Sequence, residues 1–199
     1  MNKFNLIFFF LFLSIALLAS DAKVGETAPG FTLKDSNGNQ HTLSDFKGKY
    51  VVLEWVNYDC PFVKKHYNSG NMQKLQKEYT EKGVVWLSIN SSAEGKQGNY
   101  SNEEINEKAK VRGANFTAYL VDESGEVGKM YGSKNTPTMY VINPEGTLIY
   151  AGGIDDKPST DVEDIKAANN YVKAALDASM NGKEIAVKIS QPYGCSVKY

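Results

Sequence analysis

The sequence has few cysteines, few histidines and no excess of charge of either sign. Of its 199 residues, two are cysteine and two are histidine, and the formal net charge is -1. Two cysteines do not make a disulfide-rich scaffold, and no cysteine or histidine spacing matches a zinc site. A net charge near zero gives no reason to expect nucleic acid as a partner. The sequence therefore predicts no metal, no cofactor and no nucleic-acid partner.

Long apolar runs are also lacking, except near residue 1. Lys3 provides a positive start, and a nearly unbroken apolar run from Leu6 to Leu18 leads into small residues. This order is typical of a secretory signal, and the run is shorter than the roughly 20 residues that a membrane span needs. We expect residues 1–22 to be a signal peptide that is cleaved after Ser20 or Ala22. The mature chain is then expected to be periplasmic or secreted, without a membrane contact. Disulfides persist in these compartments.

The remaining residues, 23–199, contain no linker and read as one domain. The predicted strands span residues 31–35, 40–43, 49–57, 84–89, 118–121, 138–142 and 147–150, and the predicted helices span residues 61–82, 101–112, 126–131 and 161–181. An Asn-Gly turn joins the first two strands as a hairpin. Continuous apolar runs in the third and fourth strands are typical of central strands that are covered on both faces. Strands that alternate with helices predict a three-layer α/β sandwich.

Four short segments carry a family pattern. They read VGETAPGFTL at 24–33, LSDFKGK at 43–49, WVNYDCPFV at 55–63 and NTPT at 135–138. Together they resemble the redoxin (AhpC/TSA) family of the thioredoxin-like superfamily. The third segment falls where that family has its active-site loop, and the fourth where it has a proline after a cis peptide bond. The resemblance implies a thioredoxin-like three-layer α/β/α sandwich with an N-terminal β-hairpin extension.

The loop is most similar to that of the peroxiredoxin-like subgroup, which has one cysteine followed by Pro-Phe-Val or a close variant. The tail at 193–198, YGCSVK, also resembles this subgroup. Thioredoxins carry Cys-x-x-Cys, whereas Val63 stands where their second cysteine would be. Peroxiredoxins carry Thr or Ser three residues before the cysteine, whereas this chain has Asn57. The hydroxyl that orients a peroxide is therefore missing, which favours disulfide exchange over peroxide reduction.

Cys60 is the candidate nucleophile, because the thiolate is the reactive form in both reactions. If Pro61 is the first helical residue, Cys60 lies at the N-cap, where unpaired N–H groups and the helix dipole favour the thiolate. Phe62 is expected to flank the thiol as an apolar wall. His66 lies six residues on, away from the thiol around the helix, and we expect it and His41 on the surface.

Two further sites are expected to support the nucleophile. The resemblance implies that Pro137 follows a cis bond and that Thr136 presents its backbone to an extended substrate. Glu54 interrupts a buried apolar strand. It is either buried with a raised pKa, which would let it relay protons to the cysteine, or paired with a lysine at the edge of the layer.

Cys195 has three alternative roles. It resolves an oxidised Cys60 as a redox partner, forms a permanent bridge to Cys60, or is a bystander that pairs with another chain. A bridge requires Cα atoms within roughly 7 Å of each other, which the sequence does not reveal.

These observations predict an extracytoplasmic thiol-disulfide oxidoreductase. Cys60 is the nucleophile and Cys195 the resolving cysteine. The expected partners are a protein or small-molecule thiol, disulfide or peroxide, together with an external thiol reductant. The residues expected to contact substrate are Pro61, Phe62, Thr136 and Pro137. A thiol-dependent peroxidase of the peroxiredoxin-like antioxidant type, or a non-enzymatic thioredoxin-fold binding module, is the alternative.

Overall fold

The computed structural model describes residues 21–199, so that all but the last two residues of the predicted signal peptide lie outside it. Within the described part, the Ala22 backbone N–H donates to the Met130 carbonyl at 3.1 Å. Ala22 also packs beside the apolar core. The folded domain therefore already includes Ala22.

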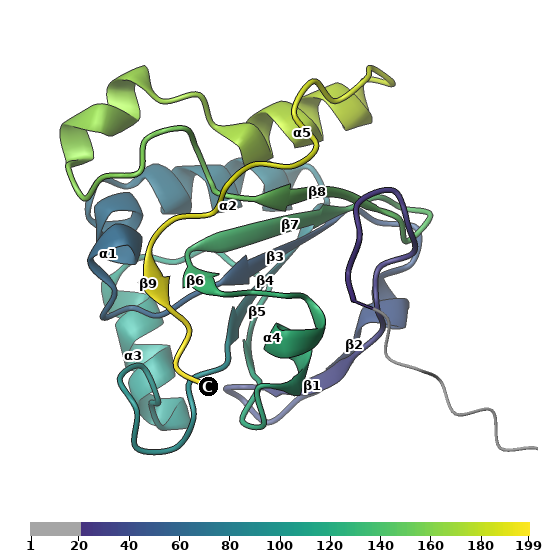
Figure 1. Cartoon of the computed structure of the whole chain (residues 1–199). Helices are drawn as coiled ribbons and strands as arrows, with labels where there is room; N and C mark the ends of the chain where they lie inside the picture. The colour runs from purple at the N-terminus through teal and green to yellow at the C-terminus, as the bar shows by residue number, and fades with distance from the viewer. Residues whose placement is uncertain (1–20) are drawn as a thin grey trace, which may run out of the picture.

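A seven-stranded mixed sheet in the order β2-β1-β5-β4-β3-β7-β8 forms the centre of the molecule (Figure 1). Its strands are β1 Thr32–Asp35, β2 Gln40–Thr42, β3 Val51–Trp55, β4 Val85–Asn90, β5 Ala118–Val121, β7 Thr138–Ile142 and β8 Leu148–Gly152. β3 pairs in parallel with β4, and β4 with β5, while the other pairs are antiparallel. Every residue of β3 and β4 is buried, as their continuous apolar runs predict.

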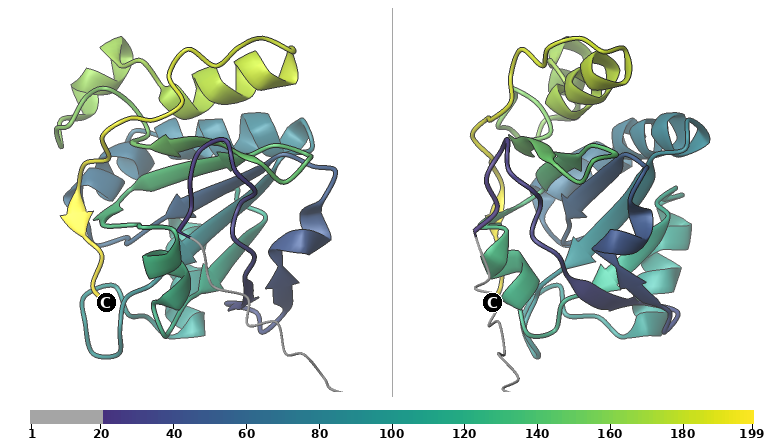
Figure 2. Two further views of the ribbon diagram at one scale, coloured as in Figure 1. Left: turned by 45° about the vertical axis from the view of Figure 1, so that its right-hand side comes forward. Right: turned by 90° about the vertical axis from the view of Figure 1, so that its right-hand side faces the viewer.

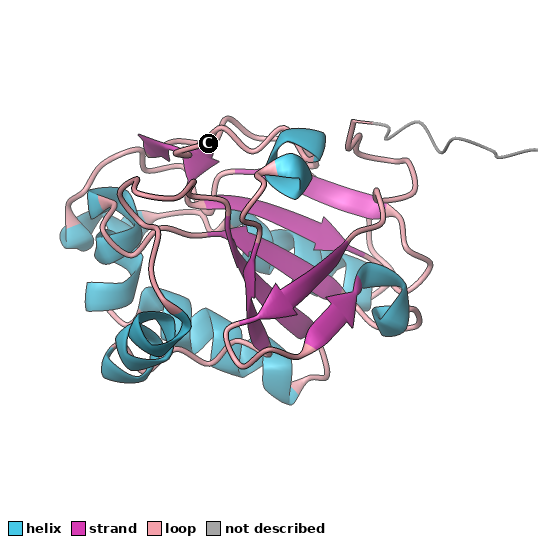
Figure 3. Ribbon diagram, turned by 90° about the horizontal axis from the view of Figure 1, so that it is seen from below, coloured by secondary structure: helices cyan, strands magenta, loops and turns pink. Residues whose placement is uncertain are grey.

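Helices cover both faces of this sheet (Figure 2). One face packs against helices α1 Pro61–Asn68, α2 Asn71–Glu81, α3 Asn102–Val111 and α5 Tyr171–Met180. The other face packs against α4 Glu126–Met130, the 3-10 helix η1 Leu43–Phe46 and the segment that precedes β1. Figure 3 shows the twisted strands with helices on either side. The predicted thioredoxin-like three-layer sandwich and its N-terminal hairpin, β1–β2, are confirmed.

None of the helices formed by residues 21–199 has the length and apolar character needed to cross a membrane.

Two helices that the sequence predicts as continuous are interrupted. The predicted helix 61–82 breaks between α1 and α2, where Gly70 adopts a φ of 74°, a conformation that glycine accepts without steric cost. The predicted helix 161–181 starts as the 3-10 helix η2, Val162–Ala167, and resumes as α5. Between them the Asn169 backbone N–H donates to Asp156 at 3.0 Å, and the Asn170 side chain caps α5. These polar contacts replace helical hydrogen bonds.

The C-terminal tail, for which the sequence predicts no element, contains a short strand that forms a separate two-stranded sheet with β6. β9, Cys195–Ser196, pairs antiparallel with β6, Asn135–Thr136. In Figure 1 the tail, drawn in yellow, leaves α5 and passes α1 before it reaches β6. This pairing places Cys195 near the loop that follows β3.

Candidate functional site

Cys60 follows the carboxyl end of β3 and begins the first helix. It is the N-cap of α1, and Pro61 is the first helical residue, as predicted. The Cys60 backbone N–H donates to the Asn57 carbonyl at 3.0 Å, which closes the loop after the strand. The residue is 0% exposed. The thiol thus sits at the positive end of a helix dipole and away from solvent.

Thr136 and Pro137 lie against this thiol. Their peptide bond is cis, as the resemblance implied. The Cys60 thiol donates a hydrogen bond to the Thr136 carbonyl, with Sγ and O separated by 3.2 Å. The Thr136 hydroxyl is buried and has no hydrogen-bond partner among residues 21–199. That hydroxyl is therefore free to donate to Cys60 when the thiol ionises.

Cys195 lies opposite Thr136 in the β6–β9 pair, next to Cys60, and both cysteines are free thiols. Burial raises the pKa of Cys60, but the side chains of Cys195 and Thr136, with smaller contributions from backbone N–H groups, favour its thiolate form and outweigh burial. The pKa of Cys60 therefore lies below its ordinary value. Burial, followed by the interaction with Cys60, raises the pKa of Cys195 to about 11. The pair thus combines a thiol that ionises readily with one that keeps its proton.

Glu54 is fully buried in β3. Its carboxylate accepts four hydrogen bonds, at 2.8–3.0 Å, from Tyr67 Oη, Gln76 Nε2, Trp86 Nε1 and Ser88 Oγ. Burial raises the pKa of Glu54, and these hydrogen bonds offset part of the rise. The alternative of a lysine partner at the layer edge is wrong, because the hydrogen bonds to the carboxylate come from neutral side chains in the core. None of these four contacts reaches Cys60.

His66 is not on the surface, and this prediction was wrong. It is 0% exposed; its Nε2 lies 3.2 Å from the Tyr193 hydroxyl and its Nδ1 lies 2.8 Å from Asn71 Nδ2. Burial, together with nearby Lys65, lowers the pKa of His66 to about 3, so the ring is neutral. The tail folds over α1 and covers this side of the helix, a long-range contact that helical spacing does not reveal.

The other histidine also differs from the prediction. The His41 side chain is only 20% exposed, and its Nε2 lies 2.9 Å from Asp35 Oδ2. The β1–β2 hairpin places the two residues on adjacent strands, since Leu33 pairs with His41. It lies in the N-terminal hairpin, apart from the cysteine pair.

Tyr193 is the main site-forming residue that sequence reasoning missed. Its hydroxyl donates to Asp155, which is 2% exposed, and its ring packs edge-on against Phe62 with centroids 5.8 Å apart. Phe62 therefore packs against the tail, and its role as an apolar wall beside the thiol stays a prediction. Pro61 is exposed beside it. Only the tail motif YGCSVK could have pointed to Tyr193, and it gave no indication of what the ring contacts.

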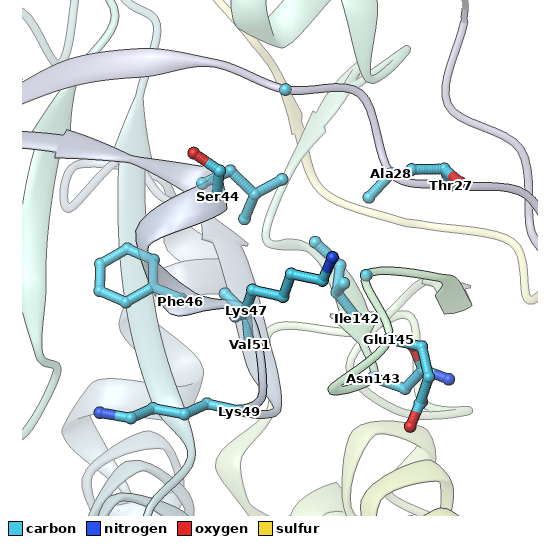
Figure 4. Close-up of a pocket in the computed structure, with 13 residues that line it drawn as sticks. Thr27, Ala28, Ser44, Phe46, Lys47, Lys49, Val51, Ile142, Asn143 and Glu145 are labelled. Carbon is cyan, nitrogen blue, oxygen red and sulfur yellow. The ribbon is translucent and has the colours of Figure 1, made fainter.

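A cavity of about 310 Å³ lies at the other end of β3, where Val51 begins the strand (Figure 4). Its lining includes Phe46, Lys47 and Ile142, and Figure 4 shows the Lys47 side chain extending toward Ile142. Cys60 follows the opposite end of the same strand, and neither cysteine lines this cavity. In the described chain, no three His, Cys, Asp or Glu side chains group as metal ligands. The cavity and the cysteine pair therefore lie at opposite ends of β3.

Comparisons with known proteins identify the family of the chain. Residues 24–151, more than half of the chain, match the model of the AhpC/TSA family. The chain is 32% identical over 125 residues to the thiol-disulfide oxidoreductase ResA of Bacillus subtilis (strain 168), a match that covers 63% of this chain and 64% of ResA. The chain thus spans slightly less than two thirds of that relative.

Two further similarities extend the match. The chain is 30% identical over 135 residues to the thioredoxin-like protein YneN of Bacillus subtilis (strain 168), covering 67% of this chain and 74% of YneN. A crystal structure of an uncharacterized conserved protein from Geobacillus kaustophilus is similar at a TM-score of 0.76 and 30% identity, covering 89% of this chain and 92% of that one. With the family model, the fold and the loop in agreement, the chain belongs to the AhpC/TSA family.

Proposed function

We propose that this protein is a thiol-disulfide oxidoreductase whose redox pair is Cys60 and Cys195. One observation carries the proposal. The β6–β9 register sets Cys195 opposite Thr136, whose carbonyl accepts the hydrogen bond of the Cys60 thiol. This arrangement supports Cys60 as the nucleophile and Cys195 as the resolving cysteine, although the two residues are far apart in sequence. The name of ResA, a thiol-disulfide oxidoreductase, supports the same reaction.

The asymmetry of the two thiols supports a direction for each step. The Cys60 thiolate attacks one sulfur of a substrate disulfide; that disulfide bond breaks and the other substrate sulfur leaves with the electron pair. Cys195 then attacks the Cys60 sulfur of the mixed disulfide, and its proton passes to the departing substrate sulfur. The substrate gains two electrons, and Cys60 and Cys195 become a disulfide. We assign substrate contact to the surroundings of Cys60, namely Pro61, Phe62, Thr136 and Pro137.

Asn57 supports disulfide exchange over peroxide reduction. It occupies the position where peroxiredoxins carry a hydroxyl, and its side chain is used within the loops. Its Oδ1 accepts the Asp59 N–H at 2.9 Å and its Nδ2 donates to the Gln97 carbonyl at 3.1 Å. A side chain engaged in this way holds the loop and offers no donor that is directed at Cys60.

We further propose that the reaction takes place outside the cytoplasm, in the periplasm or after secretion. The support is the charged, apolar and small-residue order of residues 1–22. Disulfides form and persist in such oxidising compartments. Glu54 is proposed as a proton relay for the cysteines on the strength of its burial and raised pKa alone.

The test is the reduction potential of the pair. The purified mature chain is equilibrated with glutathione buffers, and the Cys60–Cys195 disulfide is quantified by mass spectrometry after alkylation. We expect a reversible bridge with a potential above about -250 mV, in the range of working redox pairs. A bridge that persists below about -300 mV would be structural, and no bridge at all would remove the proposed pair. Cys195→Ser is the matched control, since it keeps Cys60 but forms no intramolecular bridge.

A further inference from the structure

The cavity of about 310 Å³ at the start of β3 takes no part in the proposed function. Its lining includes Val51, the first residue of β3, whereas Cys60 follows the other end of that strand. The volume lies at the lower end of the roughly 300–1,000 Å³ that small-molecule sites occupy. A small organic molecule can therefore occupy the cavity without contact to either cysteine.

Backbone hydrogen bonds tie together the three chain segments that line this cavity. The segment before β1 is joined to the β7–β8 turn, because the Ala28 N–H donates to the Gly146 carbonyl at 2.9 Å. The loop after η1 is joined to the same turn, because the Gly48 N–H donates to the Pro144 carbonyl at 2.9 Å. The cavity is therefore formed before a ligand binds, and little free energy is lost in ordering the chain around it.

Apolar side chains form much of the lining. Val51 and Ile142 are buried and lie opposite each other in the β3–β7 pair. Leu43 and Phe46 of η1 also line the cavity and are only partly buried. A ligand with an apolar body would remove part of this surface from water, which favours binding.

Three charged side chains belong to the same lining, and all of them are exposed. They are Lys47, Lys49 and Glu145, so that two positive charges and one negative charge give a net charge of +1. None of them forms an ion pair with another residue of the described chain. Figure 4 shows Lys47 extending toward Ile142, whereas Lys49 extends away from it. The Lys47 amine is therefore the charge that is placed to meet a ligand in the cavity.

We propose that this cavity binds a small apolar carboxylate, of the size of a short fatty acid. The apolar tail of the ligand covers Val51, Ile142 and Leu43, and its carboxylate accepts charge-assisted hydrogen bonds from Lys47 Nζ. A neutral ligand of the same shape leaves the Lys47 amine without an anionic partner, and a cationic one is repelled by it. Binding here is a property separate from thiol-disulfide exchange, so that either can fail without the other.

The experiment titrates hexanoate into the purified mature chain and follows the methyl signals of Leu, Val and Ile by NMR. We expect saturable shifts at Leu43, Val51 and Ile142, with a dissociation constant of about 1 mM or lower. Hexan-1-ol and hexylammonium have the same tail without the negative charge, and each should bind about fivefold more weakly or worse.

Three results would overturn the proposal. The first is the absence of saturation by about 20 mM hexanoate, at which a site of the expected affinity is nearly full. The second is equal affinity for hexanoate, hexan-1-ol and hexylammonium, which would show that charge plays no part. The third is a set of shifts that lies away from Leu43, Val51 and Ile142, which would place the ligand elsewhere.

Charge variants of the exposed side chains supply the second arm. Lys47→Met should weaken hexanoate binding about fivefold, the effect of an ion pair of about 1 kcal/mol, and should leave hexan-1-ol binding unchanged. Lys49→Met is its matched control, since it removes the same charge from a side chain that points away from the cavity, and it should change the affinity less than about twofold. Glu145→Gln removes the negative charge of the lining and should strengthen hexanoate binding. Equal effects of Lys47→Met and Lys49→Met would show that Lys47 does not hold the carboxylate.

Discussion

The pKa of Cys60 depends on its neighbour, and replacing Cys195 by alanine or by serine tests this directly. Burial alone raises the pKa of Cys60, and the hydrogen bond from the Cys195 thiol is the first of the contributions that bring it below the ordinary value. Alanine removes the donor. Serine keeps a hydroxyl in the same place, so that the two variants differ by one hydrogen bond to the Cys60 sulfur.

The expected magnitude follows from the strength of such a bond. A hydrogen bond to a charged group contributes about 1.5–3 kcal/mol, and one pKa unit corresponds to about 1.4 kcal/mol. Loss of the donor disfavours the thiolate and leaves the neutral thiol unaffected. The pKa of Cys60 should therefore rise by about one to two units in Cys195→Ala, whereas Cys195→Ser should keep most of the depression.

The assay is the ultraviolet absorbance of the thiolate as a function of pH, with the rate of iodoacetamide alkylation as a second readout. The chain has two cysteines, so each variant contains a single thiol and gives one titration curve. Circular dichroism establishes that both variants are folded. The reasoning is refuted if alanine and serine give the same pKa, or if the alanine variant has the lower one.

Three further changes probe the surroundings of the pair. Thr136→Val removes the hydroxyl that is free to donate to the Cys60 thiolate, so the pKa of Cys60 should rise by about one unit; an unchanged titration would exclude this donor. Because burial raises the pKa of Glu54 above 4.5, the native state keeps a proton that the unfolded state releases, and the free energy of unfolding should fall as pH rises from about 4.5 through the raised value. Glu54→Gln should flatten this decline when the free energy of unfolding in urea is measured against pH, and parallel profiles of variant and wild type would show that Glu54 does not titrate as described. An unchanged rate of thiol-disulfide exchange in the variant would exclude its proposed role as a proton relay. Tyr193→Phe removes a hydrogen-bond donor from buried Asp155. The free energy of unfolding in urea should fall by about 1–3 kcal/mol, and proteolysis of the tail should become faster. If neither changes, this contact does not anchor the tail.

Local patterns in the sequence determined the elements that form over a few residues. The Asn-Gly turn predicted the hairpin, and continuous apolar runs predicted the central strands. Pro61 after Cys60 predicted a helix that starts at the cysteine, and the observed N-cap confirms it. The predicted helix 101–112 is observed as α3, and Ser101 and Glu104 form a capping box at its start. The family segments predicted the cis bond before Pro137.

Tertiary structure alone decided which distant residues meet. The neutral, buried state of His66 depends on the tail that covers it. The pairing of Cys195 with Thr136 joins segments whose separation in sequence contains no signal of contact. Helix caps and strand periodicity act through bonds between near neighbours, whereas these contacts arise only when the whole sheet places the end of β3, the β6 turn and the tail at one edge. For this reason the sequence alone predicted Cys60 as the candidate nucleophile, and only the fold places Cys195 opposite Thr136, which contacts the Cys60 thiol.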